Sequence, residues 1–236
     1  MNAILVRVGA DRSQGGGFWN GPVDGRTGEF AYVAIPENAP LHTGLEQPYN
    51  AILPFLARFG VALPPHLAHR SMHLDPDFAN LTYGDQGERG KQLRAYLRPG
   101  DLIVFYASLA DSRSSARLIY ALIGLLVVDR FVLAANVPAH ERSLNAHSRR
   151  ILKDDAHDVI VHGRPRISGR LQRCLPIGEF RDRAYRVRSD VLDHWGGLTV
   201  KGGYLQRSAR LPKFLNPRRF CDWLERQNPE LIQANN

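Results

Sequence analysis

Short apolar runs alternate along this chain with stretches rich in glycine, proline and polar residues. Gly124 interrupts the longest apolar run, and a glycine at such a place predicts a bend of the kind that closes small β-barrels. A Pro-Gly-Asp turn at residues 99–101 leads into another apolar run. Runs of β-branched and aromatic residues predict strands at residues 3–8, 30–35, 102–106, 118–128, 157–161 and 183–188.

Four segments have the apolar spacing of helices. In one of them, Leu93 and Leu97 share a face that we expect to be buried. Asn216 followed by Pro217 has the sequence of an N-cap and a first helical position. The last dozen residues show no such pattern, and we expect them to be frayed. The predicted helices are residues 48–59, residues 88–97, residues 139–148 and a closing helix from Asn216.

The order of these elements predicts a single domain over residues 1–236 with an α+β fold. Strands that bend around glycine favour a mixed β-barrel at its centre, with the helices at the periphery. The 44% of hydrophobic residues is enough for a continuous core. The chain shows neither an internal repeat nor a long linker.

The cysteines and the chain start suggest a compartment. Cys174 and Cys221 lie far apart without a C-x-x-C pair, so neither a disulfide framework nor a thiolate zinc site is expected. The first residues do not resemble a secretion signal, and the apolar run at 118–128 is too short to cross a bilayer. We therefore expect a cytoplasmic protein without membrane contact.

Charge is distributed unevenly around a net value of +8. Residues 162–220 hold fourteen Lys or Arg and four Asp or Glu, which leaves a net charge of −2 for the rest of the chain. Arginine forks bind phosphate oxygens and stack on bases, so this basic C-terminal portion favours a polyanion as partner. The alternative is a solvated surface encoded by a genome rich in arginine codons. Affinity for DNA or RNA that falls steeply with salt would distinguish the two.

A glycine-rich loop spans residues 10–23, between two predicted strands. It lacks both the Gly-Lys-Ser/Thr ending of a P-loop and the glycine spacing of a dinucleotide fold. Its glycines can bring backbone amides close to an anion, and its aromatic and polar side chains suit a base. The alternative is that the glycines only turn the chain and Trp19 fills the core. The nucleotide contacts predicted here are Asp11, Ser13, Gly16, Gly17, Trp19 and Asn20.

The sequence His73-Leu-Asp75-Pro-Asp77 is the second candidate for chemistry. Alternate residues of an extended segment share a face, so the three side chains could bind a divalent cation or act as an acid–base group. Asp-Pro-Asp is also an ordinary turn sequence, and three residues alone rarely complete a metal site. We therefore predict a turn that places His73 and Asp75 at a nucleotide pocket, with no bound metal or other cofactor.

Two later segments combine basic residues with histidine or aromatic rings. In residues 139–150, His140 and His147 are seven apart on a predicted helix whose basic end could bind phosphate, although surface histidines are the alternative. Residues 195–210 interleave glycine pairs with rings and charges, which suits single-stranded or flipped nucleotides, unless they form a plain turn-rich connection. Neither segment provides an activated nucleophile. The contacts predicted from them are His147, Arg149, Lys201, Tyr204 and Arg207.

Two family resemblances follow from motifs along the chain. Residues 93–106 and 123–129 resemble the Gly-Asp strand and the Ile-Gly-x-x-x-Val strand of PUA-like barrels of the EVE, YTH and ASCH groups. The longer order of motifs is similar to the third type of nucleotide-modification-associated domain, from phage and bacterial gene neighbourhoods for hypermodified DNA bases. The segments that carry this similarity are residues 9–11 with the glycine loop, 73–77, 100–106, 123–129 and 145–147.

The second resemblance implies a role in base modification of DNA and transfers no catalytic residue. We predict a protein that binds a nucleotide or a DNA base in a pocket formed by the glycine loop, His73, Asp75 and Tyr106, within a modification or phage-defence system that includes other proteins. The alternative is an enzyme that modifies a base or nucleotide with Asp11, His73 or Asp75 as acid–base group. A third hypothesis is an RNA-binding domain for tRNA or rRNA. The residue pattern does not decide between binding and catalysis.

Overall fold

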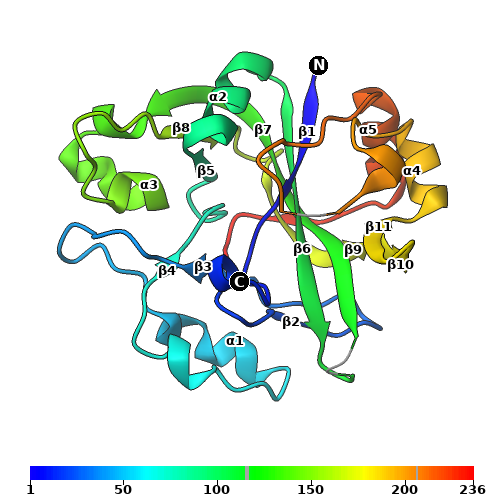
Figure 1. The fold of residues 1–236 in the computed structure, drawn as a ribbon, viewed down its shortest axis with the longest axis horizontal. Helices are drawn as coiled ribbons and strands as arrows, with labels where there is room; N and C mark the ends of the chain where they lie inside the picture. The colour runs from blue at the N-terminus through cyan, green and yellow to red at the C-terminus, as the bar shows by residue number, and fades with distance from the viewer. Residues whose placement is uncertain (115–116, 206) are drawn as a thin grey trace.

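One large mixed sheet organises the computed structural model, which describes residues 1–114, 117–205 and 207–236. In Figure 1 its two longest strands run side by side through the middle of the molecule, with helices on both sides. The strands of this sheet are β1 (Ala3–Arg7), β2 (Pro22–Val23), β5 (Thr82–Asp85), β6 (Leu102–Asp111), β7 (Leu118–Leu133), β8 (Val159–Gly163), β9 (Gly169–Pro176) and β12 (Leu231–Ile232).

The order β1-β6-β7-β8-β5 forms the main path of the sheet, with β2 added to β6, β9 to β7 and β12 to β9. β1 and β2 lie parallel to β6, and the other pairs are antiparallel. Two small antiparallel sheets complete the fold: β3 (Ile35–Pro36) with β4 (Met72–His73), and β10 (Gly178–Arg181) with β11 (Ala184–Val187). The α+β class is confirmed. The strand pairings of the described residues leave the sheet open, so the PUA-like barrel is not confirmed.

The helices are short and lie around the sheet. None in the described part of the chain is long and apolar enough to cross a membrane. The α-helices are α1 (Leu53–Ala57), α2 (Gly87–Tyr96), α3 (Ala146–Arg149), α4 (Ser189–Trp195) and α5 (Pro217–Arg226). The 3₁₀ turns are Gln14–Gly16, Tyr49–Ile52, Pro65–Leu67, Ala134–Asn136, Ala139–Leu144 and Lys201–Gly203.

Both faces of the central sheet are buried, because successive side chains of a strand point to opposite faces. In β6, Phe105 packs into a core with α1 and α2, whereas its neighbour Val104 packs into a second core with α4 and α5. The closing helix begins at the predicted Asn216 cap, which accepts the N–H of Arg219, and it buries Phe220 fully. The continuous apolar runs in the sequence are therefore strands covered on two sides.

β7 bends where the sequence predicts a bend. Ile123 is skipped in the register of β7 with both β6 and β9, which is a bulge beside Gly124. The bend allows one strand to serve two partners, with β9 along residues 121–125 and β8 along residues 128–133. Phe78 occupies the space above Gly124, where a side chain would otherwise lie.

Three predicted features are wrong. Of residues 30–35 only Ile35 belongs to a strand, and Phe30 forms an isolated bridge to Val23. The predicted helix over residues 139–148 breaks at Asn145, whose extended backbone separates a 3₁₀ turn from α3. The C-terminal residues are not frayed, because β12 pairs with β9 and the Asn236 side chain bonds the backbone of Tyr32.

Replacing Gly124 with alanine should destabilise the fold. The added Cβ would lie 2.4 Å from Phe78 Cε1 and 2.7 Å from the carbonyl oxygen of Gly169. Overpacking of this kind costs about 1–3 kcal/mol of unfolding free energy, measurable by urea denaturation. Gly15→Ala is the matched control, because no atom lies within 4 Å of its added Cβ. Equal stability of the two variants would contradict the tight approach at the bend.

Candidate functional site

A cleft of about 170 Å³ opens where the end of β1 faces β4, β5 and α3. Four of the predicted site residues line it together, although they come from distant parts of the sequence: His73, Asp75, His147 and Arg207. The side chains of both histidines and of Asp75 are at most 8% exposed. Residues that line the same cleft without having been predicted include Arg7, Asp85 and Arg89, and the cleft also contains Tyr83 and Arg150.

His73 is held from behind by a carboxylate. The pairing of β3 with β4 aligns Ile35 with His73, which brings the following Glu37 alongside the ring. The His73 Nδ1 lies 2.6 Å from Glu37 Oε2, and Arg150 donates to both oxygens of Glu37 at 2.9 and 3.0 Å. Burial lowers the pKa of His73 to about 4, so the ring is neutral near pH 7. Burial opposes the ionisation of Glu37, but the bonds from His73 and Arg150 outweigh it and lower its pKa.

His147 has the same kind of support from α3. Its Nδ1 lies 2.5 Å from Asp158 Oδ2, and this bond lowers the pKa of Asp158 against the opposing effect of burial. Asn145 caps the helix by accepting the His147 backbone N–H at 2.8 Å, and its side-chain amide donates to Asp75 Oδ1 at 3.0 Å. The Asn-x-His spacing therefore places the second histidine opposite Asp75. His147 is buried and is not one of the surface histidines that the helix pattern allowed.

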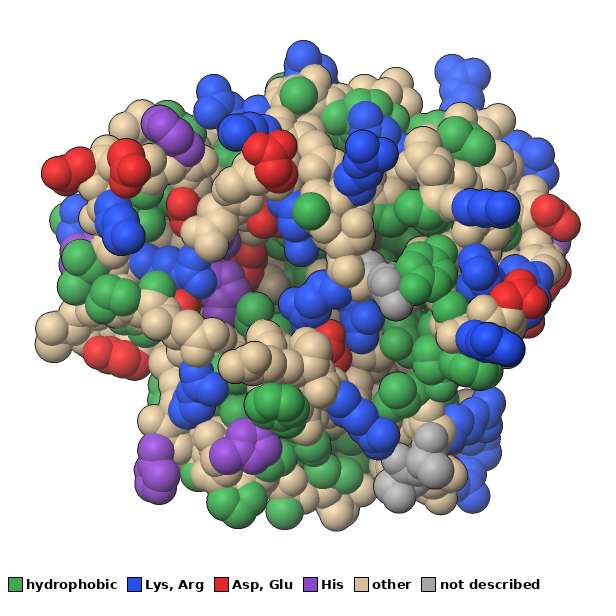
Figure 2. Space-filling model, viewed as in Figure 1, with side chains coloured by type: hydrophobic (Ala, Val, Ile, Leu, Met, Phe, Trp, Pro, Cys, Tyr) green, Lys and Arg blue, Asp and Glu red, His purple; other side chains and the backbone are tan. Residues whose placement is uncertain are grey.

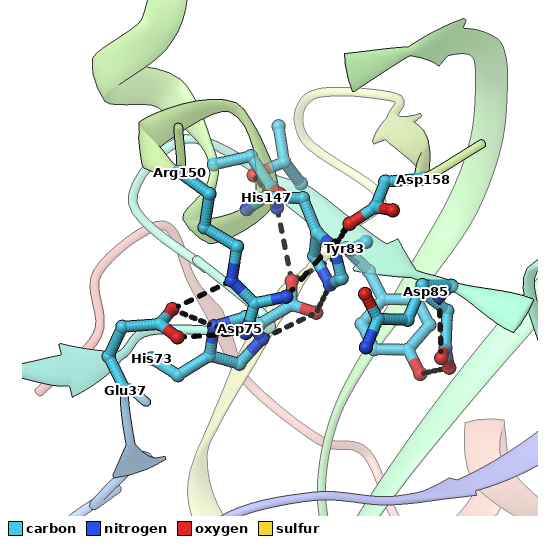
Figure 3. Close-up of polar contacts among 12 residues, drawn as sticks. Glu37, His73, Asp75, Tyr83, Asp85, His147, Arg150 and Asp158 are labelled. Carbon is cyan, nitrogen blue, oxygen red and sulfur yellow. Dashed lines mark hydrogen bonds and ion pairs between the residues drawn. The ribbon is translucent and has the colours of Figure 1, made fainter. Parts of the chain in front are cut away.

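Asp75 lies between the two histidines (Figure 3). One of its oxygens, Oδ1, accepts the Gly84 backbone N–H at 2.8 Å as well as the Asn145 amide. The other oxygen, Oδ2, lies 4.0 Å from His73 Nε2 and 3.7 Å from His147 Nε2. Burial raises the pKa of Asp75 to about 7. A buried acid and two oriented histidines at a cleft are typical of a functional site.

Four arginines surround this centre, and each is positioned by a carboxylate. The Asp11 carboxylate binds Arg7 at 3.2 Å and Arg207 at 2.9 Å. Arg89 lies 2.9 Å from Asp85 and donates to the hydroxyl of Tyr83. Arg150 is held by its bonds to Glu37, as described above. A guanidinium carries five N–H donors, so each arginine retains donors beyond those used within the protein.

Asp11 is the residue of the glycine loop that binds two arginines of the cleft. Ser13 donates to the Asp11 carboxylate through its backbone N–H at 2.8 Å and through its hydroxyl. Burial acts to raise the pKa of Asp11, but the bond from the Ser13 hydroxyl and the charges of the two arginines outweigh it. The pKa of Asp11 is therefore below its usual value, and the carboxylate stays ionised. Gly16 lies directly against that carboxylate, where no Cβ would fit.

Other residues of the predicted pocket lie elsewhere. Gly17 lines a separate surface cavity with the exposed Phe18. Trp19 packs against the apolar core, and Asn20 donates to the backbone oxygen of Ser108. Tyr106, which we expected as a pocket wall, is only 1% exposed and belongs to the core beneath α4 and α5. Lys201 and Tyr204 line a cavity of about 660 Å³ with Arg181, Arg183 and Arg186.

Asp77 does not share a ligand face with His73 and Asp75. Its Oδ2 binds Arg149 at 2.8 Å, and its Oδ1 accepts from Asn235 near the C-terminus. Arg149 is 3% exposed and also donates to the backbone oxygen of Ser143, so its guanidinium is held within the protein. This pair is a buried structural clamp.

Sequence reasoning missed the partners that hold the histidines. Glu37 and Arg150 are 113 residues apart, and no local pattern joins them. Their positions next to strands could have indicated both carboxylates, since Glu37 directly follows a strand and Asp158 directly precedes one. A charged residue at the end of an apolar strand, near a histidine on the neighbouring strand, is a candidate partner of that histidine.

The fold and the site together define an α+β protein in which a buried His–Asp–His cluster faces an arginine-lined cleft. The chain belongs to the family described as nucleotide modification associated domain 3, whose model matches residues 2–233. This confirms the resemblance seen in the sequence motifs and links the chain to nucleotide modification. No curated protein and no solved structure gives a significant match to the chain.

The Arg149→Ala variant should lose about 3–5 kcal/mol of unfolding free energy, because it leaves Asp77 buried without its partner. Urea denaturation measures the loss. His140→Ala is the control from the same segment, since the His140 side chain is 80% exposed. A variant of Arg149 with normal stability but weakened DNA binding would instead assign it to the ligand.

Proposed function

We propose that the protein is an enzyme of nucleotide modification and that the cleft is its active site. The substrate is a nucleotide unit, and we favour DNA over RNA as its source. Its phosphate binds at the arginines, and the group to be modified lies at His73, Asp75 and His147. The observation that carries this proposal is the convergence of these three buried side chains at one opening, each fixed by its own polar partner. Such support is needed for catalysis, which requires positioned groups.

The lining of the cleft supports an enzyme over a reader of modified bases. Readers hold a flat base between aromatic walls. Among the described residues that line this cleft, Tyr83 is the one phenolic or indole ring, and its hydroxyl is fixed between Asp85 and Arg89. The cleft offers ionisable groups instead of stacking faces.

Phosphate is the natural anion for the arginines around the cleft. Arg7, Arg89, Arg150 and Arg207 approach it from four different segments of the chain, and paired guanidinium groups are already oriented when a ligand arrives. We assign Asp11 to the positioning of Arg7 and Arg207, and not to acid–base chemistry, because its carboxylate already accepts from four donors.

The second basic cavity extends the surface available to a longer nucleic acid. Figure 2 shows Lys and Arg side chains along the right-hand edge of the molecule, over the region of α4, α5 and the β10–β11 pair. Tyr204 belongs to this cavity and Arg207 to the cleft. Three residues span at most about 11 Å, so the two openings lie near each other. A strand held at the second cavity would place a neighbouring nucleotide at the cleft.

Substituting Arg207 should weaken the binding of single-stranded DNA. We expect Arg207→Gln to lower the affinity for a labelled oligonucleotide about tenfold in fluorescence anisotropy, since a charge-assisted bond contributes about 1.5–3 kcal/mol. Arg94→Gln is the matched control, because Arg94 is exposed on α2 and lines neither the cleft nor the second cavity. Equal losses in both variants would indicate a diffuse basic surface and contradict the cleft.

Catalysis should depend on Asp75. We expect mass spectrometry to find at least one nucleoside or nucleotide whose amount differs between cells that express the wild-type protein and cells that express Asp75→Asn. The substitution keeps the shape of the side chain and removes its charge. Identical pools, combined with unchanged DNA affinity of the variant, would show that the protein binds nucleic acid without modifying it.

A further inference from the structure

The ring N–H groups of His73 and His147 are directed toward carboxylates behind the rings, away from the cleft. Each Nδ1 lies within 2.6 Å of a carboxylate oxygen, of Glu37 for His73 and of Asp158 for His147. A carboxylate only accepts, so each Nδ1 must be the protonated nitrogen that donates. In the neutral ring the other nitrogen, Nε2, then carries a lone pair. Both lone pairs face the cleft.

Between these lone pairs lies a third acceptor, Asp75 Oδ2. The two donors that Asp75 has, Gly84 and Asn145, both bind its other oxygen. No hydrogen bond to Oδ2 or to either Nε2 occurs among the described residues, and these three atoms lie within 4.8 Å of one another. Three buried acceptor atoms without a donor are unfavourable, unless a cation or a proton lies among them.

We propose that His73 Nε2, Asp75 Oδ2 and His147 Nε2 bind one divalent first-row transition-metal ion. A point equidistant from atoms with these separations lies about 2.5 Å or less from each of them. That is a few tenths of an ångström above usual Zn–N and Zn–O bond lengths of about 2.0–2.2 Å. Small side-chain rotations close the difference. His147 thus takes the place that the sequence motif suggested for Asp77.

The surroundings of the cluster fit a metal site independently of these distances. Metal-bound histidines almost always donate their second ring N–H to a carboxylate or a carbonyl, and here Glu37 and Asp158 fill that role. Arg150 joins the two supports, since it binds Glu37 at 2.9 Å and lies 3.9 Å from Asp158. Such a second layer fixes the ring orientation before the ion arrives.

The donor set selects the class of ion. Two imidazoles with one carboxylate suit zinc, iron, cobalt or manganese, whereas calcium and magnesium prefer oxygen ligands alone. Three protein ligands at the floor of an open cleft leave coordination positions for water or a substrate oxygen, which is the pattern of catalytic sites and not of structural ones.

Charge balance at the cleft also favours a cation. Five carboxylates and four guanidinium groups line the cleft or pair with residues that line it. With Asp75 ionised, their net charge is −1. A divalent ion would turn this into +1 and attract a phosphate. The carboxylates are Asp11, Glu37, Asp75, Asp85 and Asp158, and the guanidinium groups are Arg7, Arg89, Arg150 and Arg207.

Metal titration of the full chain tests the site. After EDTA treatment and dialysis, isothermal titration with ZnCl₂ should show one ion per chain, and Asp75→Asn and His147→Gln should each weaken the affinity at least 100-fold. Asp75→Asn should remain folded, because the introduced amide can donate to a histidine Nε2, and circular dichroism checks this. His140→Gln, at an exposed histidine outside the cluster, should bind as the wild type does.

Cobalt adds a spectroscopic measurement that reports directly on the ligands of the ion, which a purely structural role of these residues would not affect. Co²⁺ bound by nitrogen and oxygen ligands should give visible absorption bands that saturate at one equivalent and disappear in Asp75→Asn. Glu37→Gln, which alters the support of His73, should weaken binding about 10–100-fold and leave the stoichiometry unchanged. A wild-type chain that takes up no stoichiometric Zn²⁺ or Co²⁺, or a folded Asp75→Asn that binds them equally well, would overturn the proposal.

The metal site rests on the same side chains as the proposed enzyme but not on its activity. The titrations use no nucleic acid, so stoichiometric metal with unchanged nucleotide pools would leave the metal site standing and remove the enzyme. Conversely, Asp75-dependent nucleotide changes in a chain without metal affinity would leave an acid–base enzyme.

Discussion

The candidate site depends on the Asp75 carboxylate, whose two oxygens have different surroundings. Asp75 Oδ1 accepts from the backbone of β5 and from Asn145, which fixes the carboxylate plane and turns Oδ2 toward both histidines. The position of His147 beside Asp75 requires a glycine at position 84, because a Cβ there would lie 2.3 Å from the His147 ring. The missing side chain lets α3 approach β5, which brings His147 next to Asp75.

The buried charges around Asp75 carry a desolvation cost, and they are arranged as ion pairs. Glu37 with Arg150 and Asp77 with Arg149 each satisfy a carboxylate that would otherwise be unpaired in the interior. Apolar residues of similar size can be as stable as buried ion pairs, so stability alone does not explain them. The Asp77 pair ties α3 to the segment after β4, while the Glu37 pair orients a histidine. Fixed geometry at the cleft is the gain that both pairs share.

The sequence shows the sheet more clearly than the site, because the two depend on interactions of different range. Apolar runs and the Asn216 cap are local signals, and they predicted the main strands and the closing helix. His73 and Asp75 were found because they are two residues apart. The sequence pattern placed His147 on a continuous helix. In the structure the helix breaks at Asn145, whose side chain bonds Asp75, 70 residues away. No window of sequence contains that bond.

The glycine loop makes other contacts than the direct nucleotide contacts that its composition predicts. Its composition suggested direct contact with a nucleotide, yet Gly16 and Ser13 both close around Asp11. Asp11 in turn bonds Arg7 and Arg207, which belong to the cleft. Small residues are needed here because the buried carboxylate must accept from donors on several sides at once, which leaves no space for a Cβ. In the proposed site the loop would therefore act on a ligand indirectly, because Asp11 fixes the orientation of two guanidinium groups.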